Sequence, residues 1–548
     1  MMKKLISAFA CGLLAFAATS PVAADRDTPI PPQALQTIRH MAIQHNGRVK
    51  PFESFARETL SLITGEPQWG HDDPVQTVVS MMANPDHWQQ IPMLTVPFIP
   101  LREPLGLARK TKRISYNDLV ATRKLMGMLP AIVGKQRRDE KLTIAENETM
   151  DLFQRFVTLS DVLEQKISIV PPAVATEHVW VSVTELTGYA SQQQEVLRGA
   201  WVSFLEAVRV GQSSVVDERA TQLVQQLTAA NPSAYPARWR LNLEVWYHHA
   251  QPFRIAWVAY LVAVIALLVN LGSARTSTTV LGAVALGTAF IVHAGGILCR
   301  VILGGRPPVS NFFETMLWLP FVAVVVSLIL ERIYRARYIS LAAAMLAAIT
   351  LILAEHVPLD SSISPVVAVL HSNLWLTIHV LTIVASYGAL ALATVLAHVY
   401  GWLYVTRRTP HPALPALGLF LYRVIQVGVV LLAGGIMLGA VWANASWGRY
   451  WGWDPKETWS LITLLWFLAI LHGRFAGWIK GVGVALSTIT GFFLLLMTYY
   501  GVSFYLVGLH SYAGGHAKPL PALLITYLVV EAAFIITVGA VAARRRTT

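Results

Sequence analysis

The sequence predicts an all-α polytopic membrane protein with about nine transmembrane helices and an N-terminal, mainly α-helical extracytoplasmic domain. Of its 548 residues, 54% are hydrophobic and only 14% are charged, which is too apolar for a soluble multidomain enzyme. Beyond residue 252, runs of nearly twenty apolar residues recur, and each is long enough to cross about 30 Å of hydrocarbon. Residues 25–252 hold most of the charge and contain no such run.

The first 24 residues have the pattern of a secretory signal peptide. Two lysines precede a short apolar run, and small residues at 22–24 offer a cleavage site. An uncleaved membrane anchor is the alternative, and in either case the next segment begins outside the cytoplasm. The two cysteines, Cys11 and Cys299, are too far apart in sequence to suggest a disulfide framework or a CxxC site. Any redox chemistry is therefore expected from a cofactor or a partner.

Residues 25–252 are interpreted as an extracytoplasmic domain of unknown role. Segments such as 160–167 and 192–210 have the periodicity of amphipathic helices. The stretch 46–60, NGRVKPFESFARETL, is expected to form a turn followed by an amphipathic helix, and it points to no particular chemistry. The remaining residues, 253–548, form the predicted transmembrane domain.

The predicted spans are nine apolar segments. They lie near 254–271, 279–302, 313–331, 340–355, 373–404, 420–441, 460–476, 482–507 and 521–542. The predicted inner loops are richer in arginine than the outer ones, which indicates a multi-pass protein of the bacterial inner membrane with a periplasmic N-terminal domain and a cytoplasmic C-terminus. The net charge of +12 is scattered, so membrane lipid is an expected partner and nucleic acid is not.

A tryptophan-rich loop is expected between the sixth and seventh spans, on the outer side. Five of the chain's 17 tryptophans fall within 442–459, beside Asp454. An interfacial aromatic belt is the simplest explanation, but a belt places one or two such rings at each helix end. So dense a set indicates a platform for a flat apolar ligand, such as a porphyrin, a quinone or a lipid headgroup. The tryptophans are Trp442, Trp447, Trp451, Trp453 and Trp459.

Two histidines sharpen this prediction. His379 lies just inside the outer end of the fifth span, and His510 lies just beyond the outer end of the eighth. Each alone is more often a packed residue, but two imidazoles at one level beside the tryptophans would suit the two axial positions of a haem iron. His356, His371 and His516 are also near the outer face and are alternatives.

Two further histidines lie deeper in the predicted membrane region. His472 is roughly 18 Å and His293 roughly 15 Å from the outer surface at 1.5 Å of rise per residue. Their similar depths are compatible with a second bis-histidine site inside the bilayer. The alternative is that each histidine is separate and hydrogen-bonded to its own surroundings.

Several motifs together resemble one family. WGRYWGWDPKETWS (447–460) resembles the WWD signature of the CcsA/ResC proteins of System II cytochrome c biogenesis, and its PKETW ending differs from the System I proteins CcmC and CcmF. The segments at 305–315, 376–390, 470–474 and 508–516 are also similar to CcsA segments, in the family's order. The resemblance covers roughly 280–520.

The resemblance implies a membrane subunit of a cytochrome c synthase, or haem lyase. Its substrates would be haem b and the CxxCH motif of an apocytochrome c, whose thiols add to the haem vinyl groups. The resemblance implies that His379 and His510 are the outer axial ligands and that the tryptophan loop with Asp454 holds the porphyrin. It implies that His472 is a ligand of an internal haem on its way across the membrane.

The second ligand of that haem would come from a CcsB/ResB-like subunit, which leaves His293 uncertain because residues 1–250 do not resemble ResB. A separate subunit of that kind, or a thiol-reducing partner, is therefore an expected partner. Two other functions stay open. One is a CcmC-like protein that delivers or exports haem without forming thioethers, and the other is a transporter of a non-haem solute.

Overall fold

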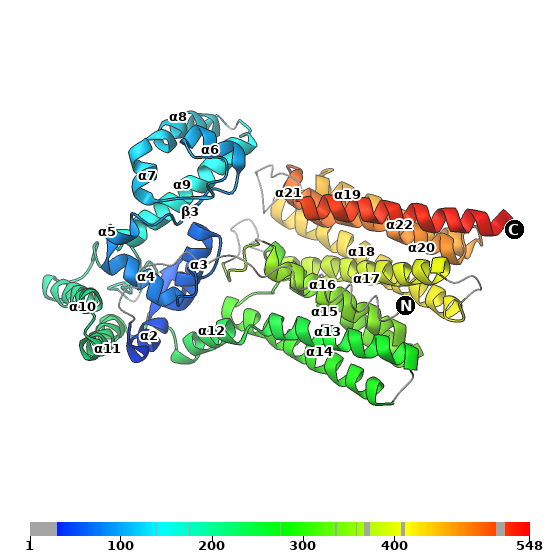
Figure 1. Cartoon of the computed structure of the whole chain (residues 1–548), viewed down its shortest axis with the longest axis horizontal. Helices are drawn as coiled ribbons and strands as arrows, with labels where there is room; N and C mark the ends of the chain where they lie inside the picture. The colour runs from blue at the N-terminus through cyan, green and yellow to red at the C-terminus, as the bar shows by residue number, and fades with distance from the viewer. Residues whose placement is uncertain are drawn as a thin grey trace. The chain divides into compact units, whose positions relative to one another are not determined.

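The computed structural model describes residues 30–138, 140–174, 176–273, 276–334, 337–357, 359–365, 373–406, 411–510 and 521–547. The predicted signal peptide, 1–24, lies outside the described residues. The described part is mostly α-helical, with two short two-stranded sheets, and nine of its helical segments are long and apolar enough to cross a membrane (Figure 1). The prediction of an all-α polytopic membrane protein is confirmed.

The chain divides into two compact units, described here separately. The first contains residues up to His45, Val49–Leu129 and Thr149–Leu241, and the second contains the remaining residues. The first unit has one core of buried aliphatic and aromatic side chains. The elements up to residue 250 are α2 (Pro32–Arg39), β1 (Ala42–His45), β2 (Arg48–Pro51), α3 (Phe52–Thr64), α4 (Pro74–Ala83), α5 (Pro85–Trp88), β3 (Leu94–Thr95), α6 (Ile99–Leu105), β4 (Arg113–Ile114), α7 (Tyr116–Thr122), α8 (Lys124–Arg137), α9 (Ile144–Leu163), α10 (Ser191–Val210), α11 (Ser213–Ala230) and α12 (Arg238–Ala250).

The stretch 46–60 folds as predicted. Strands β1 and β2 pair around a tight turn in which Asn46 and Gly47 have positive φ angles of 50° and 73°. Asparagine followed by glycine adopts this conformation at little cost. Helix α3 follows at once, and its apolar face buries Phe52 and Phe55 in the core of the first unit. The predicted turn and amphipathic helix are confirmed.

The second unit is a bundle of long apolar helices. Each of the nine predicted spans coincides with one candidate membrane helix. The eighth span is continuous through a short π-helical turn, η2, between α20 and α21. The elements are α13 (Pro252–Ser273), α14 (Thr276–Gly304), α15 (Phe312–Tyr334), α16 (Arg337–His356), α17 (Asn373–Thr406), α18 (Leu414–Trp447), α19 (Pro455–Phe475), α20 (Gly481–Leu496), η2 (Met497–Gly501), α21 (Val502–Tyr505) and α22 (Ala522–Thr547).

The stretch 442–459, predicted as a loop, is mostly helical, and this is a correction. Helix α18 continues to Trp447 and ends where Gly448 adopts a left-handed conformation. Helix α19 begins at Pro455, because the preceding Asp454 and the later Glu457 form a reciprocal capping box. Only residues 448–454 connect the two helices, since both helices extend beyond their most apolar parts.

Helices α17 and α18 pack closely through glycines and lie side by side in Figure 1. A Cβ atom at Gly428, Gly435 or Gly439 of α18 would approach a residue of α17 to within 2.7 Å. These glycines are spaced by seven and four residues, so they share one face of the helix. Small residues let the two backbones approach, as is common between membrane helices. The close packing brings α18 against the part of α17 that carries His379.

Candidate functional site

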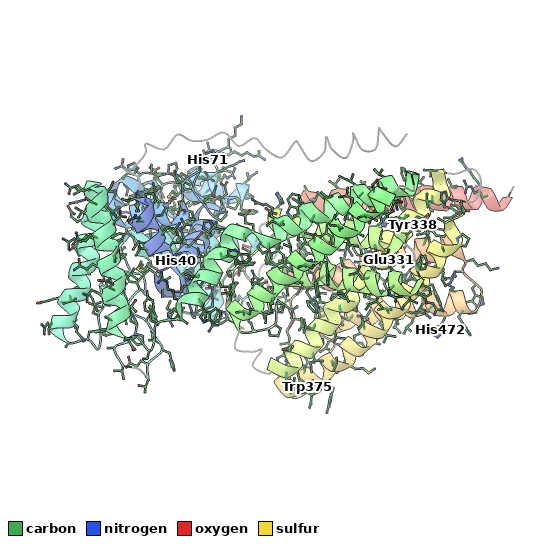
Figure 2. All side chains as sticks on the ribbon, turned by 90° about the horizontal axis from the view of Figure 1, so that it is seen from below. His40, His71, Glu331, Tyr338, Trp375 and His472 are labelled. Atoms are coloured by element: carbon green, nitrogen blue, oxygen red, sulfur yellow. The ribbon has the colours of Figure 1, made fainter. Side chains whose placement is uncertain are left out.

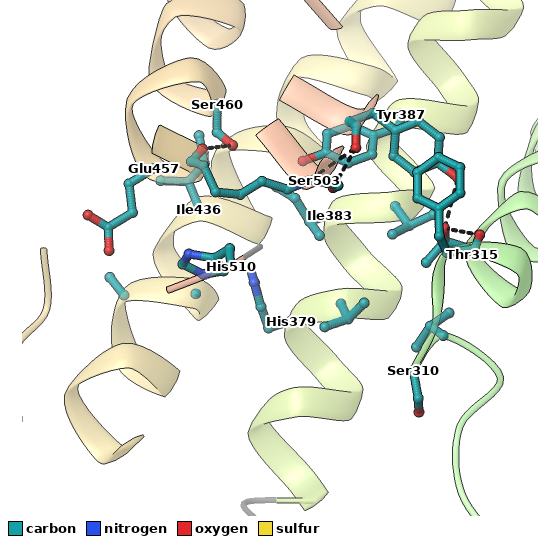
Figure 3. A pocket seen from close by; sticks show the side chains of 18 of the residues that line it. Ser310, Thr315, His379, Ile383, Tyr387, Ile436, Glu457, Ser460, Ser503 and His510 are labelled. Atoms are coloured by element: carbon teal, nitrogen blue, oxygen red, sulfur yellow. Dashed lines mark hydrogen bonds between the residues drawn. The ribbon is translucent and has the colours of Figure 1, made fainter. Parts of the chain in front are cut away.

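A pocket in the second unit lies where α17, α18 and α19 meet the residues at the start of α15 (Figure 3). The space inside it, open solvent included, is about 1120 Å³. Most of the lining surface is apolar. The lining residues are Val309, Ser310, Asn311, Phe312, Thr315, His379, Val380, Ile383, Val384, Tyr387, Ile436, Gly439, Ala440, Tyr450, Trp451, Lys456, Glu457, Ser460, Tyr499, Ser503 and His510.

The two histidines predicted to face each other at one level both line this pocket. Nδ1 of His379 lies 2.8 Å from the carbonyl oxygen of Gly435, and Nδ1 of His510 lies 2.8 Å from Oδ2 of Asp454. Both oxygens are acceptors, so each Nδ1 is the donor and Nε2 is the nitrogen left for another ligand. A neutral imidazole held in this way is suited to bind a metal through Nε2.

Trp442 and Trp447 pack against the histidines rather than forming the wall of the pocket. The Trp442 ring is 1% exposed and stacks on His379 with centroids 6.1 Å apart and planes 13° apart. It also lies 5.9 Å from the His510 ring. The Trp447 ring meets His510 edge-on at 5.2 Å and Trp442 at 4.7 Å. The two indoles therefore restrict the orientation of both imidazoles.

The other three predicted tryptophans do not complete a single platform. Trp451 lines the pocket. The Trp453 ring meets the Trp451 ring edge-on, with centroids 5.7 Å apart, but Trp453 is 69% exposed. Trp453 also has a φ angle of +57°, which is strained for an aromatic residue. Trp459 lies on α19 away from the lining. The five rings separate because two belong to α18, two to the connection and one to α19.

Asp454 connects the start of α19 to His510. Besides accepting a hydrogen bond from His510, its carboxylate accepts from the backbone N–H of Lys456 at 3.0 Å and of Leu509 at 2.6 Å. Burial favours the neutral acid, but the hydrogen bond and charge of His510 and these N–H groups hold the pKa of Asp454 below its ordinary value. A carboxylate behind a histidine orients it and makes it a stronger ligand.

A buried ion network supports the opposite wall, which begins at Val309. Glu314, on the first turn of α15, is 1% exposed and pairs with Arg300 at 2.9 Å and with Arg306 at 2.6 Å. The same carboxylate accepts from the backbone N–H of Ser310 at 2.9 Å. The guanidinium groups also donate to the backbone carbonyls of Ser361, Ser362 and Ser364. The network fixes the segment 305–315, a role that the sequence motif alone did not reveal.

The structure does not bring His293 and His472 together. His293 is fully buried between α13 and α15, and its ring nitrogens lie 3.3 Å from the Tyr260 hydroxyl and 3.0 Å from the Leu317 carbonyl. His472 is exposed at the periphery of the helices (Figure 2), and its Nδ1 lies 2.8 Å from the Leu468 carbonyl. They belong to different helices, α14 and α19, and each is hydrogen-bonded to its own surroundings, which is the alternative that the sequence left open.

Of the three alternative histidines, His356 lies within the described residues. His356 is exposed, is bonded through Nδ1 to the Ile352 carbonyl at 2.9 Å and does not line the pocket. His371 and His516 lie outside the described residues.

Substitution of Gly439 by alanine is expected to displace His379 and to lower haem retention roughly 10-fold. This is the lower end of the 10- to 100-fold loss of affinity that is usual when the groups supporting a metal ligand are disturbed. A Cβ atom at this position would lie 2.6 Å from Cε1 of His379, which is too close for the ring to stay in place. Gly434→Ala is the matched control, because nothing lies within 4 Å of its Cβ position. Haem per purified protein measures the effect, and equal retention in the two variants would contradict it.

Comparison with known proteins identifies relatives of the part of the chain that contains the pocket. A family model described as "Cytochrome C assembly protein" matches residues 309–510. These are also the first and last residues that line the pocket. The cytochrome c biogenesis protein CcsA of Prochlorococcus marinus (strain SARG) is 31% identical over 293 residues, which are 47% of this chain and 91% of that protein.

Two further relatives extend the comparison. CcsA of P. marinus strain AS9601 is 34% identical over 251 residues, which are 39% of this chain and 79% of that protein. Protein NrfI of Wolinella succinogenes is 29% identical over 501 residues, or 87% of this chain and 54% of NrfI. This chain therefore spans about half the length of NrfI, and the match includes part of the N-terminal region.

Proposed function

The chain belongs to the CcsA family of cytochrome c biogenesis proteins, and from this premise we propose that it presents reduced haem b to apocytochrome c as part of a cytochrome c synthase. The observation that carries the proposal is the pair His379 and His510, each anchored through Nδ1 and lining one pocket. Two such imidazoles are the ligands expected of a six-coordinate haem. The apolar lining of the pocket also suits a porphyrin.

The proposed reaction needs no nucleophile from this chain. In each of two additions, a cysteine S–H of the CxxCH motif adds across a haem vinyl group, forming one C–S and one C–H bond without net oxidation. The chain would hold the porphyrin in a fixed orientation between the two histidines, so that the thiols meet the vinyl groups. This is catalysis by positioning. The histidine of the substrate motif would then replace one of the chain's ligands.

The same proposal places the pocket at the periplasmic side of the bacterial inner membrane. The arginine-rich connections on the other side of the predicted spans support this orientation. A signal peptide at 1–24, an extracytoplasmic domain at 25–252 and a transmembrane haem-handling domain at 253–548 would follow from it.

Haem would reach the pocket from an internal site that includes His472. Because His472 is exposed at the periphery of the described helices, a second ligand from a CcsB/ResB-like subunit fits better than one from this chain. His293 is better explained as a packed residue. Its ring contacts Tyr260, Phe253, Phe321 and the Leu317 carbonyl.

Expression with a reporter apocytochrome in cells that lack their own maturation system tests the function. We expect haem that stays attached to the CxxCH reporter after denaturation, provided that a ResB-like subunit is present. A reporter in which both cysteines are serine is the control and should carry none. Purified protein that contains haem without any attachment to the reporter would favour the CcmC-like function, and protein without haem would favour the transporter.

A further inference from the structure

One positive charge lies in the pocket and forms no ion pair with another described residue. Lys456, on the first turn of α19, lines the pocket, and its Nζ donates to Ser503 Oγ at 3.1 Å and to the Tyr499 carbonyl at 3.4 Å. Both acceptors are neutral, and the bond to the Tyr499 carbonyl is long. Among the described residues, no carboxylate lies within 4.0 Å of this Nζ, although ion pairs occur elsewhere in the same unit. A partly buried ammonium group gains most from an anionic ligand.

A second polar group lies at the same wall. The Tyr387 hydroxyl is buried beside the Ser460 side chain, and both residues line the pocket. Its ring meets Tyr499, whose carbonyl accepts from Lys456, with centroids 5.7 Å apart. Figure 3 shows Tyr387, Ser460 and Ser503 on one side of the two imidazoles and Ser310 on the other. Donors therefore gather at one end of a mainly apolar pocket.

We propose that Lys456 and Tyr387 form a carboxylate subsite that binds a propionate of haem, so that the propionate edge of the porphyrin points toward α19 and η2. The inference rests on the proposed function, and it adds the orientation of the substrate. The two vinyl groups of haem b lie on the half of the ring opposite the propionates. They would then point away from Lys456, toward the side of the pocket where the apocytochrome thiols must approach.

The other ligands considered for such a pocket do not use this subsite. A quinone has no carboxylate, and the lining around Lys456 offers an ammonium and hydroxyl groups rather than several cations. A charged hydrogen bond is stronger than a neutral one, so a carboxylate that meets both Lys456 and Tyr387 should be distinguished from its ester.

Binding of haem and of haem dimethyl ester to the purified full-length protein tests the subsite. The ester keeps the iron, the vinyl groups and the ring but carries no propionate charge. We expect the wild type to bind haem about 10-fold more tightly than the ester in Soret titrations, which is the effect of one charged hydrogen bond. Lys456→Met should weaken haem binding to the level of the ester and leave the ester unchanged. Tyr387→Phe should reduce the preference by a smaller factor.

Two further variants separate charge from fold. Lys456→Arg keeps the charge and should retain the preference for haem. Lys480→Met removes an exposed lysine before α20, outside the pocket, and should leave both affinities unchanged. The subsite would be overturned if Lys456→Met still bound haem more tightly than the ester, or if it lost affinity for both ligands equally. Neither result would contradict the haem site itself. Failure of the wild type to bind either ligand would overturn the proposed function as well.

Discussion

Replacement of Glu314 by alanine is expected to destabilise the protein by about 3–5 kcal/mol, the usual effect of removing one partner of a buried ion pair. The change leaves Arg300 and Arg306 buried, at 2% and 7% exposure, without their counter-charge. It also removes the acceptor for the Ser310 N–H. The wall of the pocket at 309–315 should loosen, and little intact protein should survive extraction and mild heating in detergent.

Glu355→Ala is the matched control for this prediction. Glu355 also pairs with an arginine, Arg254, but that guanidinium is 54% exposed and loses little when its partner is removed. Glu314→Gln, which keeps the shape and one acceptor, should fall between the two alanine variants. Equal survival of Glu314→Ala and Glu355→Ala after heating would contradict the role assigned to the buried network.

The spans could be predicted from the sequence because their signal is local. Each apolar run maps onto one helix, and Asp454 with Glu457 has the spacing of a capping box, from which the start of α19 could also have been read. The true ends of α18 and α19 were missed. The apolar runs mark only the part of each helix that suits lipid, whereas the helices continue until a glycine or a cap ends them.

Position along an apolar run predicts the distance of a residue from the end of its helix, but not the direction in which its side chain points around that helix. His379 and His510 are predicted at one level, and both line one pocket. His293 and His472 were also expected at one level, yet they belong to helices that present them to different surroundings. The approach of Gly439 to His379 and of Lys456 to Ser503 depends on packing between distant segments, so no local pattern could predict it.

Removal of either pocket histidine is expected to have the largest effect on haem. His379→Ala or His510→Ala takes away one proposed axial ligand. The affinity for haem should therefore fall by more than the 10- to 100-fold that is usual when a group supporting a ligand is removed. Asp454→Asn keeps both imidazoles but weakens the acceptor for His510 Nδ1, so it should fall within that smaller range. His356→Ala is the matched control, because His356 lies outside the pocket lining.

The most direct measurement is the absorption spectrum of the purified protein after reduction with dithionite. The wild type and His356→Ala should show the sharp bands of a six-coordinate, low-spin ferrous haem. His379→Ala and His510→Ala should show weak or five-coordinate bands that added imidazole restores. Sharp six-coordinate bands in both pocket variants without imidazole, or a wild type that holds no haem after expression with ample haem, would contradict the assignment of these two histidines as its ligands.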